Sequence, residues 1–197
     1  SAAPAQALRP IPPLAARVTD LTGTLTADQQ ARLESRLAEF ESRKGAQLAV
    51  LIVDSTQPEE IEQYSIRVAD AWKLGREKPD DGALLLVAKD DRALRIEVGR
   101  GLEGALTDLV SKRIIADTIT PLFRQGDFAG GITAGIEQII RVVDGEPLPA
   151  PDREWGGGAE RLRNLLPLLL GLVFVGSAVL RALFGRALGS AATGGIA

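Results

Sequence analysis

Two apolar runs separated by a short polar stretch restrict the fold of this chain more than any other feature of its sequence. Residues 82–88 (Gly-Ala-Leu-Leu-Leu-Val-Ala) contain no polar side chain, which is typical of a strand that is buried on both faces. Residues 94–98 (Leu-Arg-Ile-Glu-Val) alternate apolar and charged side chains, which indicates a strand with one solvated face. Because residues 89–92 are long enough only for a turn, the sequence predicts an antiparallel hairpin with an acidic tip.

Apolar residues at regular spacing predict the elements around this hairpin. Residues 47–53 should form a second buried strand, again without a charged side chain. Helices are expected at residues 26–45, 61–75, 107–119 and 127–143. The succession of strand, helix and strand over residues 47–88 makes a parallel crossover. We therefore predict an α/β fold over residues 17–146, with a mixed, mostly buried sheet and helices on both faces, an α/β/α sandwich.

The two ends of the chain differ from this central part. Residues 1–16 are rich in proline and should form an extended leader, in which Ala3-Pro4-Ala5 has the pattern that ends a signal peptide. Residues 147–164 have the composition of a Pro/Gly linker. Residues 165–184 carry a single charge and are long enough to span a hydrocarbon core of about 30 Å, so they predict a transmembrane helix. Residues 185–197 would then be a membrane-proximal tail.

The residue types that the chain lacks exclude several classes of function. It contains no His and no Cys, which excludes histidine-based triads, cysteine nucleophiles, zinc fingers and iron–sulfur ligation. The formal net charge is −3, whereas nucleic-acid binding requires clustered positive charge. We expect no nucleic-acid partner, and acid–base chemistry would depend on carboxylates, lysines or the single tyrosine.

Four acidic residues are expected to meet at one end of the hairpin. Asp80 and Asp81 enter its first strand where the glycine-rich stretch 99–104 leaves the second, and the following turn delivers Glu103 and Asp108 to the same corner. Carboxylate oxygens beside a tightly turning backbone are the chemistry of a calcium or magnesium site. The alternative is that these side chains bind backbone amides in turns and cap a helix, which suits Asp108 in particular.

Seven short motifs occur in an order that resembles the TPM domain family, which includes thylakoid-lumen phosphatase-like proteins and bacterial envelope proteins. They are Val18-Thr-Asp20, Trp72-Lys-Leu-Gly75, Asp80-Asp-Gly82, Asp90-Asp-Arg92, Gly99-Arg-Gly-Leu-Glu-Gly104, Leu106-Thr-Asp108 and Phe123-Arg-Gln-Gly-Asp127. The family usually has Asn at the position of Asp81, so this chain carries an extra carboxylate. The resemblance implies that Asp20 is a further metal ligand. A second choice of metal site is the hairpin tip with Asp90 and Asp91, where the alternative is an ordinary turn with a surface ion pair.

The resemblance implies one of two functions. The first is a membrane-anchored, single-pass, extracytoplasmic module that binds metal and assists the maintenance or assembly of other membrane proteins. TPM proteins are associated with photosystem II repair and with LemA-like membrane proteins. The second is a weak metal-dependent acid phosphatase, in which Asp81 and Asp108 would hold the cation and Arg100 or Arg124 the phosphate. Because no nucleophile is recognisable, we rank binding above catalysis, with Ca2+ or Mg2+ as the cofactor.

Overall fold

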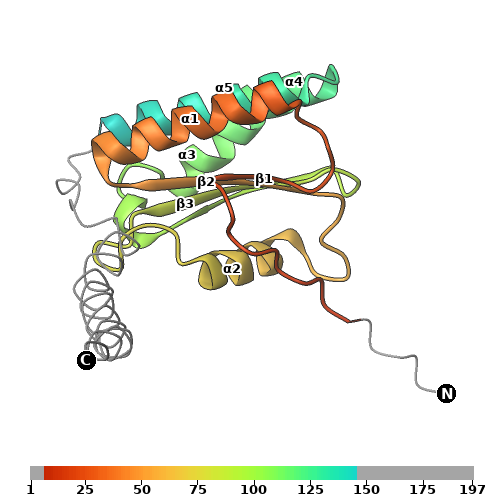
Figure 1. Cartoon of the computed structure of the whole chain (residues 1–197), viewed down its shortest axis with the longest axis horizontal. Helices are drawn as coiled ribbons and strands as arrows, with labels where there is room; N and C mark the ends of the chain where they lie inside the picture. The colour runs from red at the N-terminus through yellow and green to blue at the C-terminus, as the bar shows by residue number, and fades with distance from the viewer. Residues whose placement is uncertain (1–6, 146–197) are drawn as a thin grey trace, which may run out of the picture. The chain divides into compact units, whose positions relative to one another are not determined.

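The computed structural model describes residues 7–145 of the chain (Figure 1). Its elements are β1 (Val18–Asp20), α1 (Ala27–Lys44), β2 (Gln47–Val53), α2 (Ile61–Trp72), β3 (Gly82–Ala88), β4 (Ala93–Val98), a 3-10 turn η1 (Arg100–Leu102), α3 (Asp108–Arg113), a π-helical segment η2 (Ile114–Ile119), α4 (Thr120–Arg124) and α5 (Phe128–Asp144). The predicted strands and helices are therefore present, and β1 is an additional strand that the sequence pattern did not predict.

The strands form one mixed sheet in the order β1-β2-β3-β4. β1 and β3 both run parallel to β2, whereas β4 is antiparallel to β3. Ala88 pairs with Ala93 across the tip, which confirms the predicted hairpin. β1 is only three residues long, so it is too short to show a period in the sequence.

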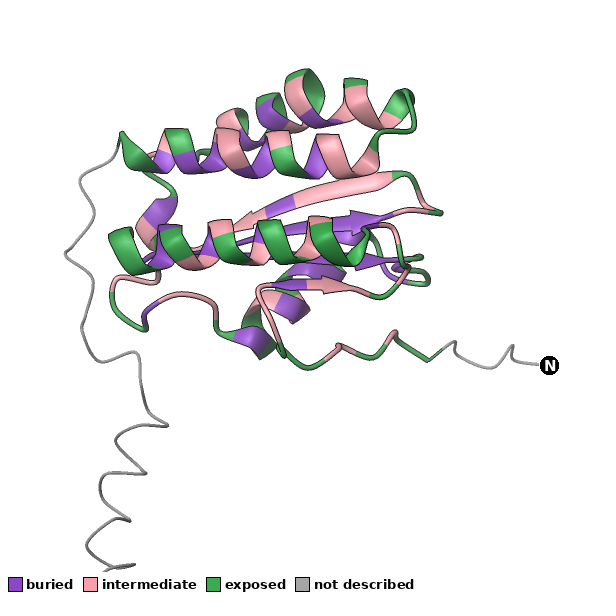
Figure 2. Ribbon diagram, turned by 45° about the horizontal axis from the view of Figure 1, so that its top comes forward, coloured by how far each residue is buried: buried purple, intermediate pink, exposed green. Residues whose placement is uncertain are grey.

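Helices cover both faces of this sheet, as the two buried runs predicted (Figures 1 and 2). Val50 and Ile52 of β2 face a core that also contains residues of α1, η2 and α5. Ala49 and Leu51, which alternate with them, face a second core on α2. Because successive side chains of a strand point to opposite faces, a central strand between two helical layers is apolar on both sides. The one polar residue of β2, Gln47 at its beginning, donates a hydrogen bond to Glu41 and accepts one from the Gly75 amide.

Helix ends follow the expected capping chemistry. Thr26 and Gln29 form a reciprocal capping box, with the Gln29 amide donating to the Thr26 hydroxyl at 3.2 Å and the Thr26 amide donating to the Gln29 side chain at 2.8 Å. The helix after Thr107 differs from the prediction, because it passes through the π-helical η2 and continues as α4 beyond Pro121. Pro121 lies at the beginning of α4, where its missing N–H costs little.

The proline-rich leader belongs to the folded unit. Residues 7–16 contain no regular secondary structure, in agreement with an extended segment, but they run along α2 (Figure 1). Ile11 packs against the core on α2, and the Trp72 indole donates a hydrogen bond of 2.7 Å to the carbonyl of Pro12. The compact unit therefore begins before residue 17, where the sequence placed its boundary.

Within residues 7–145, no helix is long and apolar enough to cross a membrane. The predicted linker 147–164, transmembrane helix 165–184 and tail 185–197 all lie outside the described residues. Those three segments stay predictions from the sequence.

Candidate functional site

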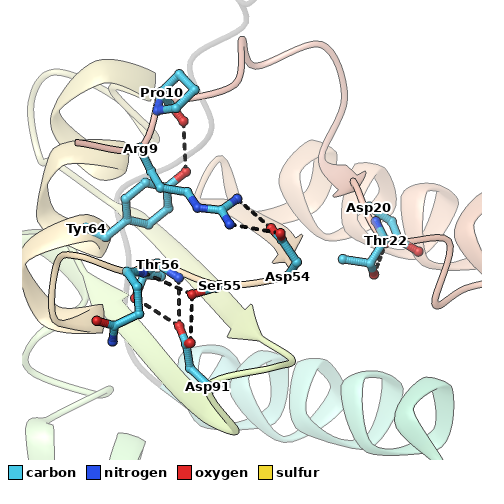
Figure 3. Close-up of polar contacts among 10 residues, drawn as sticks. Arg9, Pro10, Asp20, Thr22, Asp54, Ser55, Thr56, Tyr64 and Asp91 are labelled. Carbon is cyan, nitrogen blue, oxygen red and sulfur yellow. Dashed lines mark hydrogen bonds and ion pairs between the residues drawn. The ribbon is translucent and has the colours of Figure 1, made fainter. Parts of the chain in front are cut away.

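The carboxyl ends of β1 and β2 form a switch point of the sheet. From β1 the chain enters α1 on one face, and from β2 it enters α2 on the other face. Open α/β sheets bind ligands outside the carboxyl ends of strands at such points, because neighbouring loops diverge there. Three aspartates lie at this edge: Asp20 ends β1, Asp54 follows β2, and Asp91 lies in the turn after β3 (Figure 3).

Asp20 shapes the loop between β1 and α1. One of its carboxylate oxygens accepts hydrogen bonds from the amide and the hydroxyl of Thr22, at 2.9 and 2.8 Å. The other oxygen accepts from the Leu25 amide at 2.8 Å. Both oxygens of this predicted metal ligand are thus engaged in holding the turn.

The hairpin tip is tied to the loop after β2 through Asp91. Its carboxylate accepts hydrogen bonds from the Ser55 hydroxyl and the Thr56 amide, both at 2.7 Å (Figure 3). Among residues 7–145 the Asp91 carboxylate makes these hydrogen bonds and no ion pair, unlike the surface ion pair of the alternative. Asp90 is exposed, and its side chain makes no hydrogen bond or ion pair with any residue in the described range.

The third aspartate, Asp54, pairs with Arg9 of the leader. The Arg9 guanidinium makes a bidentate contact with Asp54, with N–O distances of 2.6 and 2.9 Å. The hydrogen bond from Arg9 lowers the pKa of the Asp54 carboxyl. The side chains of Arg9 and Asp54 remain 35% and 54% exposed, so this contact lies at the surface. An extended peptide segment is thus held at the edge where α/β proteins bind their ligands.

The structure does not bring the four carboxylates of the predicted corner together. The Asp81 side chain is completely buried, and its two oxygens accept hydrogen bonds from the Arg76 amide at 2.8 Å and the Arg76 guanidinium at 2.9 Å. Asp80 accepts from the Arg100 amide at 3.2 Å. Asp108 pairs with Lys112 at 2.7 Å, which lowers the pKa of the Asp108 carboxyl.

Arg76 supplies the counter-charge of Asp81, and Lys112 that of Asp108. Glu103 is exposed, whereas Asp81 is buried. Nowhere in residues 7–145 do three or more acidic side chains gather in a way that could hold a metal ion. The alternative for Asp108 was that it caps a helix. The structure shows instead that the Thr107 side chain caps α3. Calcium binding by this domain stays a prediction.

The catalytic candidates are similarly dispersed. Arg100 is exposed at the rim of a groove of about 820 Å³ between α2 and the end of β4, which is also lined by Asp80 and Glu103. Asp108 and Arg124 do not line this groove. Arg124 ends α4, which packs on α5 and η2. The described residues therefore show no common site for a cation and a phosphate formed by these candidates.

Two residues of the switch point, Arg9 and Asp54, are not among the residues that the sequence predicted as ligands or catalysts. Asp54 could have been found, because it directly follows a buried parallel strand and therefore lies at the carboxyl edge. Arg9 carries no such signal. It lies 45 residues from its partner, in a proline-rich segment without a period.

The TPM domain model matches residues 18–142 of this chain. No curated protein matches it. The N-terminal domain of a protein from P. gingivalis is similar, with 34% sequence identity, a TM-score of 0.63, and coverage of 70% of this chain and 87% of that chain.

Two further solved structures share the fold. The BA42 protein of Bizionia argentinensis is 19% identical with a TM-score of 0.57, covering 68% of this chain and 90% of that one. The N-terminal domain of the cg2496 protein of Corynebacterium glutamicum is 14% identical with a TM-score of 0.53, covering 76% and 96%. The match of the family model over most of the described residues confirms the resemblance found in the seven motifs, and the chain therefore belongs to the TPM domain family.

Proposed function

We propose that this chain is a membrane-tethered interaction module of the cell envelope, which assists the maintenance or assembly of other membrane proteins. The observation that carries this proposal is the contact between Arg9 and Asp54 at the switch point. The sheet edge that α/β enzymes use for substrates here holds an extended peptide segment. A surface of this kind suits the binding of a neighbouring chain better than the turnover of a small molecule.

The proposed tether is the segment 165–184. Its support is the sequence, in which this stretch carries one charge in twenty residues and follows a linker rich in Pro and Gly. Full-length protein should stay with membranes through a carbonate wash at high pH, and a chain that ends at Gly158 should be released. Release of the full-length protein by carbonate would contradict the tether. A protease supplied on the outer side of that membrane should digest the domain if the domain is extracytoplasmic, and protection of the domain would contradict this location.

The proposed cofactor is Ca2+, with Mg2+ as the second choice, and we place it at the switch-point edge, where the exposed Asp90 lies in the same turn as Asp91 and would complete a site with it only when the ion binds. Asp81 is neutralised by Arg76, whereas Asp90 is exposed and without a partner in the described range. Asp54 already attracts a cationic group. Hard oxygen ligands from loops of this kind suit calcium.

Calcium should raise the melting temperature of the protein, by several degrees at a hundredfold excess over Kd, which corresponds to about 2.7 kcal/mol. The double variant Asp90→Asn/Asp91→Asn should abolish this calcium-induced shift. The matched double variant Glu103→Gln/Asp108→Asn removes two charges from the predicted corner and should keep it. The reverse pattern would return the site to the corner. Melting of the parent protein that does not respond to calcium or to chelator would remove calcium from the proposal.

The phosphatase alternative has no support from the geometry of the described residues. Its four candidate residues are dispersed, and Asp81 is fully buried. We expect no hydrolysis of p-nitrophenyl phosphate above the level of a heat-denatured control. Turnover that depends on calcium and disappears in Asp91→Asn, while the variant stays folded, would contradict the interaction role and favour the enzyme.

A further inference from the structure

The leader contains a proline-rich motif whose hydrogen bonds all go to side chains of the domain. Residues 9–13 read Arg-Pro-Ile-Pro-Pro. Three prolines in five residues favour the extended polyproline II conformation, and they leave the carbonyl groups as the main polar sites of the backbone. Such a segment cannot dock by adding a strand to the sheet, since it lacks the N–H groups that a ladder requires.

The domain offers a matching row of donors. The Tyr64 hydroxyl donates to the Pro10 carbonyl at 3.2 Å, and the Trp72 indole donates to the Pro12 carbonyl at 2.7 Å. Both aromatic side chains come from α2. Burial raises the pKa of Tyr64, so its hydroxyl stays protonated and able to donate. Between the two prolines, Ile11 packs against the core on α2.

The arginine before the motif completes the match. Arg9 pairs with Asp54 through two parallel hydrogen bonds, and its carbonyl accepts a hydrogen bond of 3.3 Å from the Arg67 guanidinium. A bidentate ion pair at one end fixes the direction in which the segment lies. Proline-rich peptides are recognised by surfaces lined with aromatic side chains. This surface has aromatic side chains that donate to proline carbonyls, an apolar contact, and an acid that pairs with the arginine.

We propose that the surface formed by α2 and Asp54 is a docking site for proline-rich segments of other proteins. The recognised segment has an arginine directly before its first proline, and residues 9–13 are the built-in occupant that such a segment displaces. This inference rests on the interaction role proposed above and specifies the surface that binds the partner.

The contacts of the leader are suited to exchange. Its ion pair is largely exposed, and exposed pairs contribute little to stability. Pro10 and Pro13 are exposed, and Leu14 is 39% exposed. A tethered segment competes at an effective concentration on the order of millimolar. A free partner therefore binds weakly, whereas a partner in the same membrane can reach a comparable local concentration.

The test measures binding of a labelled peptide to the full-length protein in detergent, by fluorescence anisotropy with EDTA present. The peptide has the sequence of residues 7–16. In the variant Arg9→Glu the leader is repelled from Asp54, and the peptide should bind at least tenfold more tightly than to the parent, whose own leader competes. Arg9 is at the surface, so this variant should fold. The double variant Arg9→Glu/Ile11→Ser gives a second, more open receptor.

Changes in the receptor then identify the contact. In the Arg9→Glu background, Asp54→Asn should weaken peptide binding at least tenfold. Asp70→Asn removes an exposed acid of α2 that makes no hydrogen bond or ion pair with residues 7–16, and it should leave binding unchanged. A peptide with glutamate in place of its arginine should bind only to a receptor that keeps Arg9 and carries Asp54→Arg, because there the leader is repelled and the charge of the peptide is complementary.

Two results would overturn the proposal. One is the absence of peptide binding, up to about 1 mM, to both open variants while their melting temperatures stay close to that of the parent, which would make the leader a fixed strap. The other is equal weakening by Asp54→Asn and Asp70→Asn. Because the assay contains a chelator, its outcome is independent of the calcium response. If the peptide does not bind while the protein still resists the carbonate wash, only the docking proposal is wrong. The proposals of a membrane tether and of calcium binding are not affected.

Discussion

The substitution Asp81→Asn isolates the most deeply buried charge pair of the described domain. The side chains of Asp81 and Arg76 are 0% and 4% exposed. The asparagine can still accept the hydrogen bond from the Arg76 amide, which the carboxylate now accepts at 2.8 Å. It cannot neutralise the guanidinium, so the buried positive charge loses the counter-charge of Asp81. Removal of one partner from a buried ion pair typically costs about 3–5 kcal/mol.

For a domain of this size, that loss corresponds to a decrease in melting temperature of roughly 10–20 °C. Circular dichroism of the full-length protein in detergent at neutral pH would measure it. The control is Asp108→Asn, which removes a charge from the exposed pair with Lys112, whose side chains are 69% and 68% exposed. The control should melt with the parent, because exposed pairs contribute little. If Asp81→Asn also melted with the parent, Asp81 would not be a structural charge, and its family motif would require another explanation.

Three further outcomes are expected. Gly82→Ala should lower the melting temperature by several degrees, because its Cβ would collide with the backbone carbonyl of Leu74, whereas Gly145→Ala, with its nearest atom at 3.5 Å, should be neutral. Arg36 and Arg43 lower the pKa values of the Glu137 and Asp144 carboxyls. The stability from these pairs is present above the unfolded pKa values of about 4 and is lost as the pH falls through the folded values, so Arg36→Gln/Arg43→Gln should reduce the drop in melting temperature on acidification. Arg9→Ala should lower the calcium concentration needed for half of the melting shift, since it removes a competing cation from Asp54; an unchanged midpoint would place calcium away from this carboxylate.

Local sequence pattern was sufficient for most of the fold. The hairpin, the two buried strands and the helix limits at Thr26 and Gly45 follow from side-chain period and capping residues, which act between near neighbours along the chain. Seven motifs in order were also sufficient to identify the family. β1 was missed because three residues carry no period, and it becomes a strand only through its pairing with β2.

The candidate site could not be predicted in the same way, because its contacts depend on tertiary structure. The hairpin geometry correctly brought Asp80 next to the glycine-rich stretch, as its contact with the Arg100 amide shows. It could not show that Arg76 folds back onto Asp81, since that contact requires the turn between them, in which Asp80 has a φ of 66°.

The sequence by itself determined a two-sided sheet and an acidic chemistry without histidine or cysteine, because patterning and composition are properties of the chain alone. Only the tertiary structure decided which acids are neutralised and which are open to a ligand. Arg9 reaches Asp54 across 45 residues, and Tyr64 reaches Pro10 across 54. No local spacing specifies such pairs, because they form only once α2 and the sheet edge have assembled the surface on which the leader lies.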